Sequence, residues 1–205
     1  MAWTLTTLPR FMLNSLILAG VSSVVRVITA SMAAFALSFF EFRGRNVIFM
    51  LIMGTMMVPS DIVLVSNYHT VSRLGWINTY MGMMIVFFVS ANNIFMMRQY
   101  FRGLPKELEE AAYVDGAGTI KAFVRVFLAS ARQIMMTVFL FSFVWQWLDD
   151  IFTSVFLQNV PMLTTELFRL ISNSAGVDAG ISNLTEFSLM RNCGMLFLII
   201  PMLIL

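Results

Sequence analysis

The segment Glu110-Ala-Ala-Tyr-Val-Asp-Gly-Ala117 is a short polar interruption between two long apolar runs. It follows Leu104-Pro-Lys-Glu-Leu-Glu109, where the proline and the acidic side chains stand as they do in the first turn of a helix. The stretch 115–118 contains two glycines and is suited to ending that helix, and the Thr119 hydroxyl can cap the next one. The sequence therefore predicts a helix of about three turns inside a loop at 103–120.

The composition of the chain is too apolar for a soluble domain. Hydrophobic residues make up 59% of the 205 residues and charged residues 12%, and the chain contains 18 Met and 20 Phe. A soluble core of this size cannot bury so much apolar surface. The sequence thus predicts an all-α fold, a polytopic transmembrane helical bundle that forms a single domain over 1–205 in contact with membrane lipid. A net charge of +2 gives no reason to expect a nucleic-acid partner.

Five apolar runs are candidates for membrane helices, because a helix needs about 20 residues to cross the hydrocarbon core. Their approximate bounds are 11–40, 47–65, 81–102, 124–148 and 187–205. We expect Pro59 to kink the second run. Residues 159–186 are expected to form a polar connection outside the membrane, with a short amphipathic piece at 163–171. The last run barely reaches spanning length and contains Arg191, so we expect the chain to be cut short there.

The basic residues predict which side of the membrane each connection occupies. Eight of the 13 Lys and Arg residues lie in three stretches, at 41–45, 98–106 and 121–132. Connections of this kind face the cytoplasm, and the two crossings between the first two stretches agree with their lying on one side. The connections at 67–80 and 159–186 then lie outside. The same count places residue 1 outside, so we expect a further helix to precede it.

Several polar residues lie within or beside the apolar runs, and each has a structural and a functional reading. Arg26 is either a packed or hydrated structural arginine or part of a protein interface or a water-filled path. Four residues are candidates for contact with a transported solute, with packing as the alternative: Asn92, Asn93, Trp145 and Gln146. His69 and Cys193 are the sole histidine and cysteine. Neither has partners at ligand spacing, so no metal or cofactor site is predicted.

The polar segment resembles the EAA loop of bacterial ATP-binding cassette (ABC) importer permeases, on the residues Glu110-Ala-Ala112 followed by Asp115-Gly-Ala117. The Asp-Gly-Ala form is similar to that of the carbohydrate-importing branch, the maltose- or glycerol-phosphate-like permeases. Other stretches share the likeness: Asn14–Leu16, Phe42–Arg45, Met57–Pro59, Leu74–Tyr80, Arg98–Phe101 and Leu104–Ala112. The resemblance covers most of the chain, from about residue 10 to residue 150.

The resemblance implies a multi-pass permease of the type I importer kind in the bacterial inner membrane. In that family the loop forms a coupling helix, which sits in a cleft of a cytoplasmic ATP-binding subunit. The positions that match are Glu110, Ala111, Ala112, Asp115, Gly116 and Ala117, with Glu110 and Gly116 the most characteristic. The other partners implied are a second permease subunit and an extracellular or periplasmic solute-binding protein, and the cargo implied is a sugar or a related polar solute. The chain itself would hydrolyse no ATP, and its sequence contains no Gly-x-x-x-x-Gly-Lys-Ser/Thr phosphate loop.

Two features depart from the family pattern. Ala129 and Gln133 stand where the family has prolines, which predicts a straighter entry into the fourth membrane helix. The family's chains usually carry six membrane helices, whereas this sequence offers four and part of a fifth. Two alternatives remain, a truncated or inactive relative and an ATP-independent secondary transporter. The second is disfavoured, because only Arg26 and Asp61 come close to forming an ion path inside the membrane.

Overall fold

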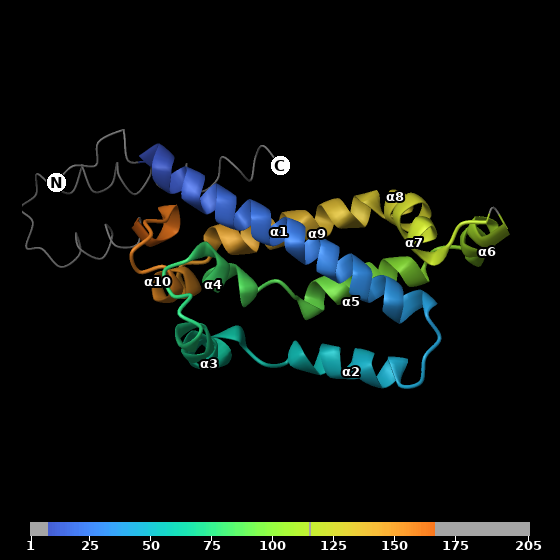
Figure 1. Cartoon of the computed structure of the whole chain (residues 1–205), viewed down its shortest axis with the longest axis horizontal. Helices are drawn as coiled ribbons and strands as arrows, with labels where there is room; N and C mark the ends of the chain where they lie inside the picture. The colour runs from blue at the N-terminus through green and yellow to red at the C-terminus, as the bar shows by residue number, and fades with distance from the viewer. Residues whose placement is uncertain (1–7, 115, 167–205) are drawn as a thin grey trace, which may run out of the picture. The chain divides into compact units, whose positions relative to one another are not determined.

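The computed structural model describes residues 8–114 and 116–166, and every regular element in these ranges is helical (Figure 1). The predicted all-α class is therefore confirmed. The predicted helix at 187–205 lies outside the described residues, together with Arg191, Cys193 and most of the connection at 159–186.

The described helical elements group into two compact units, each made of separate stretches of the chain. The elements are α1 (Leu8–Phe39), α2 (Arg45–Thr55), α3 (Ser60–Arg73), α4 (Tyr80–Ile85), α5 (Ala91–Arg102), α6 (Lys106–Val114), α7 (Thr119–Ala122), the π-helical turn η1 (Phe123–Phe127), α8 (Leu128–Ser130), α9 (Arg132–Leu148) and α10 (Ile151–Phe156). Unit 1 holds the described residues within 1–22, 64–86 and 143–205. Unit 2 holds Ser23–Val63 and Phe87–Ser142.

α1 has the length and composition of a membrane span. It contains 32 residues and is about 48 Å long at about 1.5 Å per residue, whereas the hydrocarbon core is about 30 Å thick. Among the described residues, its stretch Pro9–Phe39 is the one straight helix that is long and apolar enough to cross a membrane. Two bent pairs would each qualify as a single span, namely α2 with α3 and the stretch Thr119–Ser130 with α9. The first predicted helix, at 11–40, is thus confirmed as a helix.

The second and third predicted helices are each broken in two. At 47–65 the chain forms α2 and α3 on either side of a turn, because Pro59 lacks the N–H that would continue the hydrogen-bond ladder. At 81–102 the chain forms α4 and α5, and the break covers residues 86–90. The hydroxyl of Ser90 starts α5 by accepting the N–H of Asn93, with 3.5 Å between nitrogen and oxygen. The sequence predicts a kink at the first break, whereas the second contains no proline.

The fourth predicted helix, at 124–148, is strongly bent. The stretch Thr119–Ser130 meets α9 at an angle of 77°, and Ala131 between them has φ −87° and ψ 12°. The entry into the fourth helix is therefore not straight, although Ala129 and Gln133 stand where the family has prolines. Proline is not needed for the bend, because tertiary packing holds it.

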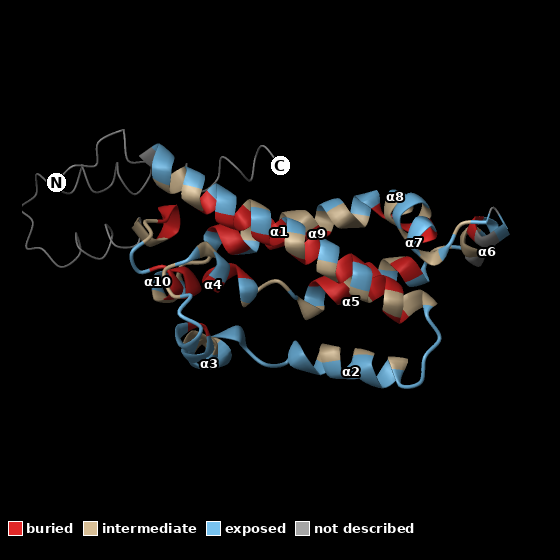
Figure 2. Cartoon of the chain, in the orientation of Figure 1, coloured by how far each residue is buried: buried red, intermediate tan, exposed pale blue. Residues whose placement is uncertain are grey.

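The aromatic core of unit 2 provides that packing. Phe35 and Phe39 of α1 contact Phe123 and Phe127 of η1, with centroid distances of 4.8 Å for Phe35–Phe123, 5.2 Å for Phe35–Phe127 and 4.2 Å for Phe39–Phe127. Such ring pairs add about 0.5–1.5 kcal/mol each beyond the area that they bury. Ala131 is completely buried at the bend. In contrast, α2 contributes no buried residue, and Figure 2 colours it exposed and intermediate along its length.

Unit 1 joins the two connections that the charge pattern places outside the membrane. Asn78 adopts a left-handed conformation with φ 62°, which asparagine tolerates better than most residues. Its N–H donates to the carbonyl oxygen of Phe156 at 2.8 Å, and its Oδ1 accepts the N–H of Asn159 at 2.9 Å. These bonds agree with the sidedness predicted from charge, since they join two connections expected on the same side.

Candidate functional site

The short helix α6 in the polar loop ends in a Schellman motif. Gly116 has φ +71°, a left-handed conformation that glycine adopts without steric cost. The Ala117 N–H donates to the carbonyl oxygen of Ala112 at 3.0 Å, so the predicted end of the helix is confirmed. Thr119 does not cap the next helix as expected, because Gly118 occupies the N-cap position and no side chain caps that helix.

The predicted loop residues divide into an anchored set and an exposed set. Ala112 is 5% exposed and belongs to the hydrophobic core of unit 2, and Ala117 packs against that core. The exposed set is Glu110, Ala111 and Gly116. Asp115 lies outside the described residues. Small side chains thus hold the loop to the helices, while the exposed set is available to a partner.

Two strongly exposed apolar side chains lie in the loop, and neither is among the site residues predicted from the sequence. Val114 is 87% exposed and Ile120 is 80% exposed. They flank the turn at Gly116 on its two sides along the chain. Strongly exposed apolar side chains within a polar loop indicate an interaction surface. The signal available in the sequence was this apolar pair on either side of the Asp-Gly-Ala-Gly stretch.

α5 leads directly into the loop and is fixed to its neighbours in unit 2 by two polar side chains. Arg98 Nε donates to the carbonyl oxygen of Leu37 at 3.3 Å, and the Arg98 guanidinium carbon lies 3.7 Å from the ring centroid of Phe49. The Tyr100 hydroxyl donates to the carbonyl oxygen of Ser130 at 2.6 Å. Both bonds satisfy carbonyl groups near helix ends, where intrahelical partners are missing. α5 is thereby tied to α1 and to the segment just before the 77° bend.

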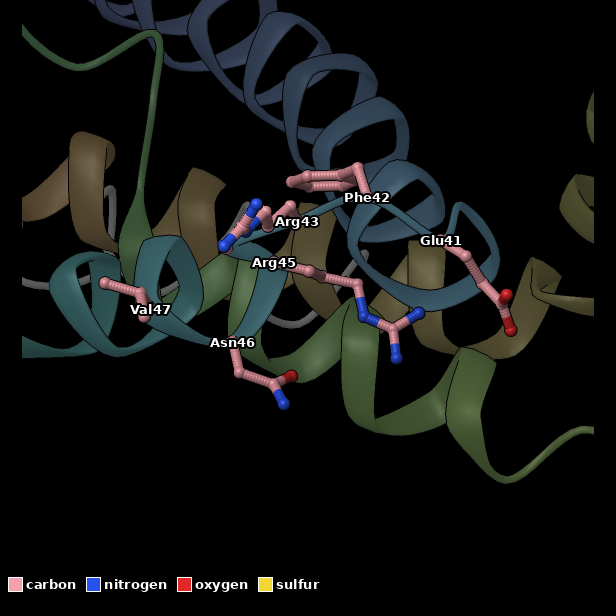
Figure 3. A pocket seen from close by; sticks show the side chains of 7 residues that line it. Glu41, Phe42, Arg43, Arg45, Asn46 and Val47 are labelled. Carbon is pink, nitrogen blue, oxygen red and sulfur yellow. The ribbon is translucent and has the colours of Figure 1, made fainter.

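The connection from α1 to α2 carries two arginines with different roles (Figure 3). Arg45 Nη1 donates to the carbonyl oxygens of Ser38 and Phe40, at 3.3 and 3.2 Å, and so caps the end of α1. Arg43 is exposed, and its side chain points away from that of Arg45. Gly44, with φ +92°, forms the turn between them. The basic connection is therefore partly structural.

Arg26 has a structural role, which is one of the two interpretations that the sequence allows. It is 5% exposed, its Nε donates to the carbonyl oxygen of Phe87 at 2.7 Å, and its guanidinium carbon lies 5.2 Å from the Phe87 ring centroid. Thr29 Oγ1 donates to the carbonyl oxygen of Phe88 at 2.7 Å. Both carbonyls lie in the break between α4 and α5. Arg26 and Thr29 thus supply hydrogen bonds that the broken helix cannot make, which is required where water is scarce.

The four candidate solute residues have different surroundings. Asn93 is buried and its Nδ2 donates to Ser142 Oγ at 2.7 Å, whereas Asn92 is exposed. Gln146 is 3% exposed and Trp145 is 42% exposed. The two pairs belong to different units. Asn93 has the packing contact that was its alternative reading, and a role of the four residues in transport stays a prediction.

Asp149, directly after α9, has an altered acidity. Burial raises the pKa of its carboxyl to about 6, although the hydrogen bonds from the Thr153 hydroxyl and N–H, at 3.1 and 3.2 Å, act in the opposite direction. Thr164 Oγ1 donates to the Asp149 carbonyl oxygen at 3.3 Å. These bonds fix the turn that leads into α10. Within the described ranges, no group of three or more His, Cys, Asp or Glu residues gathers as a metal site.

A known protein family matches most of this sequence. Residues 26–205 match the family described as "Binding-protein-dependent transport system inner membrane component". The chain belongs to this family. As an inner membrane component, it has the membrane location that its apolar runs predict, and the polar loop with α6 lies inside the matched range.

Three relatives illustrate the similarity. A probable ABC transporter permease of Pyrococcus horikoshii is 35% identical over 180 residues, which are 86% of this chain and 64% of that protein. The probable ABC transporter permease protein YurM of Bacillus subtilis (strain 168) is 31% identical over 156 residues, which are 75% of this chain and 52% of that protein. The sn-glycerol-3-phosphate transport system permease protein UgpE of Escherichia coli O157:H7 is 27% identical over 195 residues, 95% of this chain and 68% of that protein. The chain thus spans 52% to 68% of the length of these relatives.

The fold is also similar to a solved one. The crystal structure of a bacterial ABC transporter involved in the import of the acidic polysaccharide alginate contains a chain that superposes with a TM-score of 0.80. The two sequences are 24% identical, and the match covers 96% of this chain and 72% of the other. The likeness confirms the predicted architecture, an all-α importer-permease bundle.

Proposed function

We propose that this chain is a transmembrane subunit of an ATP-driven importer, and that α6 with the turn after it docks on a separate ATP-binding subunit. The observation that carries the proposal is the division of the loop into exposed and anchored residues. Glu110, Val114 and Ile120 are exposed there, while Ala112 and Ala117 are held in the core. A negative charge and two apolar side chains on a rigidly anchored base suit a groove on another protein.

The proposed cargo is a sugar or a related polar solute. Support comes from the named relatives, one of which is a permease of an sn-glycerol-3-phosphate transport system, and from the family description "binding-protein-dependent". The further partners are a second permease subunit and an extracellular or periplasmic solute-binding protein. The chain crosses the membrane several times, and ATP is hydrolysed in the ATP-binding subunit rather than in this chain.

Movement of α6 would reach the membrane helices mainly through α5. α5 directly precedes the loop and bonds to α1 through Arg98 and to the bent segment through Tyr100. The Tyr100 bond is short, at 2.6 Å, and Tyr100 packs against the hydrophobic core that contains Leu37 and Phe101. A displacement of the loop would therefore shift α1 and α9 together instead of bending the loop alone.

The test uses the transporter purified with its partner subunits and placed in lipid vesicles. Glu110→Arg reverses a charge on the proposed docking surface and should weaken the ATP-binding subunit's affinity roughly 30-fold, as expected for the loss of a central interface residue. Solute-stimulated ATP hydrolysis should be lost, while insertion into the membrane is unchanged. Gly116→Trp should have the same effect, because it distorts the turn.

Glu41→Arg is the matched control, since it makes the same charge change on an exposed residue of the connection before α2. It should leave stimulated hydrolysis within about twofold of the unmodified complex. Unchanged hydrolysis in both Glu110→Arg and Gly116→Trp would refute the docking role. Transport by the chain alone, driven by an ion gradient, would support the ATP-independent alternative instead.

A further inference from the structure

Unit 2 contains an apolar groove at the bend before α9. Its volume is about 660 Å³, and one side is formed by α1, with Val24 and Ile28. The other side is formed by the bent segment, with Leu128 before the bend and Met135 and Phe139 after it. Nine of its ten lining residues are Ala, Val, Ile, Leu, Met or Phe, and the tenth is Arg132. The groove is thus apolar throughout except for one cation.

The bent segment that forms one side of the groove carries only positive charges. Lys121, Arg125 and Arg132 are exposed, and residues 116–148 contain no Asp or Glu. A cationic segment of this kind attracts negatively charged groups at a membrane surface, with a contribution from each basic residue. The occupant that complements the groove is therefore a molecule with an apolar tail and an anionic head.

The groove lies beside the middle of α1, a helix of 32 residues that is about 48 Å long. Val24 and Ile28 lie roughly 24 and 30 Å along the helix from Leu8 at about 1.5 Å per residue, and the hydrocarbon core is about 30 Å thick. Beyond Ile28, α1 continues to Phe39, and the connection after it carries the basic residues Arg43 and Arg45. Arg132 is the last basic residue of the stretch 121–132, which the charge pattern predicts to face the cytoplasm.

We propose that this groove binds one anionic phospholipid of the cytoplasmic leaflet. Its phosphate lies against Arg132, and one acyl chain follows the wall formed by Val24 and Ile28. The bound lipid would brace the bend at Ala131, because it contacts the helical segments on both sides of it.

A membrane helix of a partner subunit is the competing occupant. Three turns of a helix about 10–12 Å wide occupy roughly 1,300 Å³, about twice the volume of the groove. A single acyl chain is narrower and flexible. The single cation among the lining residues, with no acidic residue along the same segment, also favours an anionic head over a hydrophobic helix.

The experiment uses the transporter assembled with its partner subunits in vesicles that contain a trace of photoactivatable lipid. The lipid carries its reactive group on an acyl chain and has either a phosphatidylglycerol or a phosphatidylcholine head. After irradiation, labelled peptides are identified by mass spectrometry. Phosphatidylglycerol should label peptides that contain Val24–Ile28 and Met135–Phe139 more strongly than phosphatidylcholine does.

Two variants test the two parts of the site, each with a matched control. Arg132→Gln should lower phosphatidylglycerol labelling of these peptides about fivefold and leave phosphatidylcholine labelling unchanged. Its control is Arg125→Gln, the same charge change at an exposed residue that does not line the groove. Val24→Trp should fill the groove and remove labelling by both lipids. Its control is Val21→Trp, at a position of α1 that is 46% exposed and outside the groove.

Three results would overturn the proposal. They are equal labelling by the two lipids, an equal loss in Arg125→Gln and Arg132→Gln, and cross-linking of the groove to a partner's helix in place of lipid. Labelling is measured without ATP. The lipid proposal rests on the membrane location of the chain and not on docking to an ATP-binding subunit. Its failure is therefore distinguishable from a failure of Glu110→Arg to alter ATP hydrolysis.

Discussion

Thr29→Val tests whether the break between α4 and α5 is held by side chains of α1. The substitution keeps the size of the side chain but removes the hydroxyl that donates to the Phe88 carbonyl oxygen at 2.7 Å. That carbonyl lies in a segment without helical hydrogen bonds, so it would be left unsatisfied. The bond is part-buried, and a fully buried acceptor left unsatisfied costs about 1–3 kcal/mol.

The expected result is a lower melting midpoint of the purified transporter in detergent. For a chain of this size, each kcal/mol corresponds to about 2–4 °C, so Thr29→Val should lower the midpoint by about 2–12 °C. Thr137→Val is the matched control, because the Thr137 hydroxyl donates at 3.0 Å to the Gln133 carbonyl oxygen within its own helix. The Thr137 hydroxyl does not satisfy a carbonyl group at a helix break. Thr137→Val should therefore change the melting midpoint by no more than about 2 °C.

Equal shifts in Thr29→Val and Thr137→Val would refute the reasoning, because the break would then not depend on the bond to Phe88. An unchanged midpoint in Thr29→Val would refute it as well. Arg26→Lys extends the test, since lysine keeps the charge but lacks the Nε–H that donates to Phe87. It should lower the midpoint in the same direction.

Two further predictions concern the loop and the turn after α9. Gly116→Ala places a side chain at φ +71° and should destabilise the loop by about 1–2 kcal/mol, measured as reduced stimulation of ATP hydrolysis, whereas Gly118→Ala at φ −64° should have no such effect. Both glycines have open space around them, so an equal effect of the two variants would contradict the conformational reason. Because burial raises the pKa of Asp149 to about 6, the folded state binds a proton more readily than the unfolded one, and stability should fall as pH rises from about 4 to about 6, by at most about 3 kcal/mol. Asp149→Asn should remove this pH dependence of the melting midpoint while keeping an acceptor for Thr153, and a midpoint that still falls over that range in the variant would assign the dependence to another group.

Local features of the sequence predicted much of the candidate site. The acidic first turn of α6, the small residues of the loop and the turn at Gly116 can all be read within ten residues, and the structure has the helix and the Schellman end in those places. Sequence reasoning did not separate the anchored Ala112 from the exposed Ala111. That distinction depends on which side of α6 faces the core of unit 2.

Features that depend on distant residues were missed or wrong. The break at 86–90 contains no proline, and the side chains that satisfy its carbonyls lie 61 and 59 residues earlier in the chain. The bend at Ala131 persists without the family's prolines, because aromatic rings of α1 and the Tyr100 hydroxyl hold it. In both places the backbone departs from a regular helix only because another element compensates it.

The sequence by itself determined the class of this protein, its membrane location and the position of its polar loop. Hydropathy, basic residues and the conformational freedom of Gly116 act over a few residues, so they can be read without knowing the fold. The tertiary structure alone decided where the membrane helices break and bend and which loop residues are exposed. Those properties depend on hydrogen bonds and packing between segments far apart in the chain, such as Asn93 with Ser142, and no local pattern specifies such pairs.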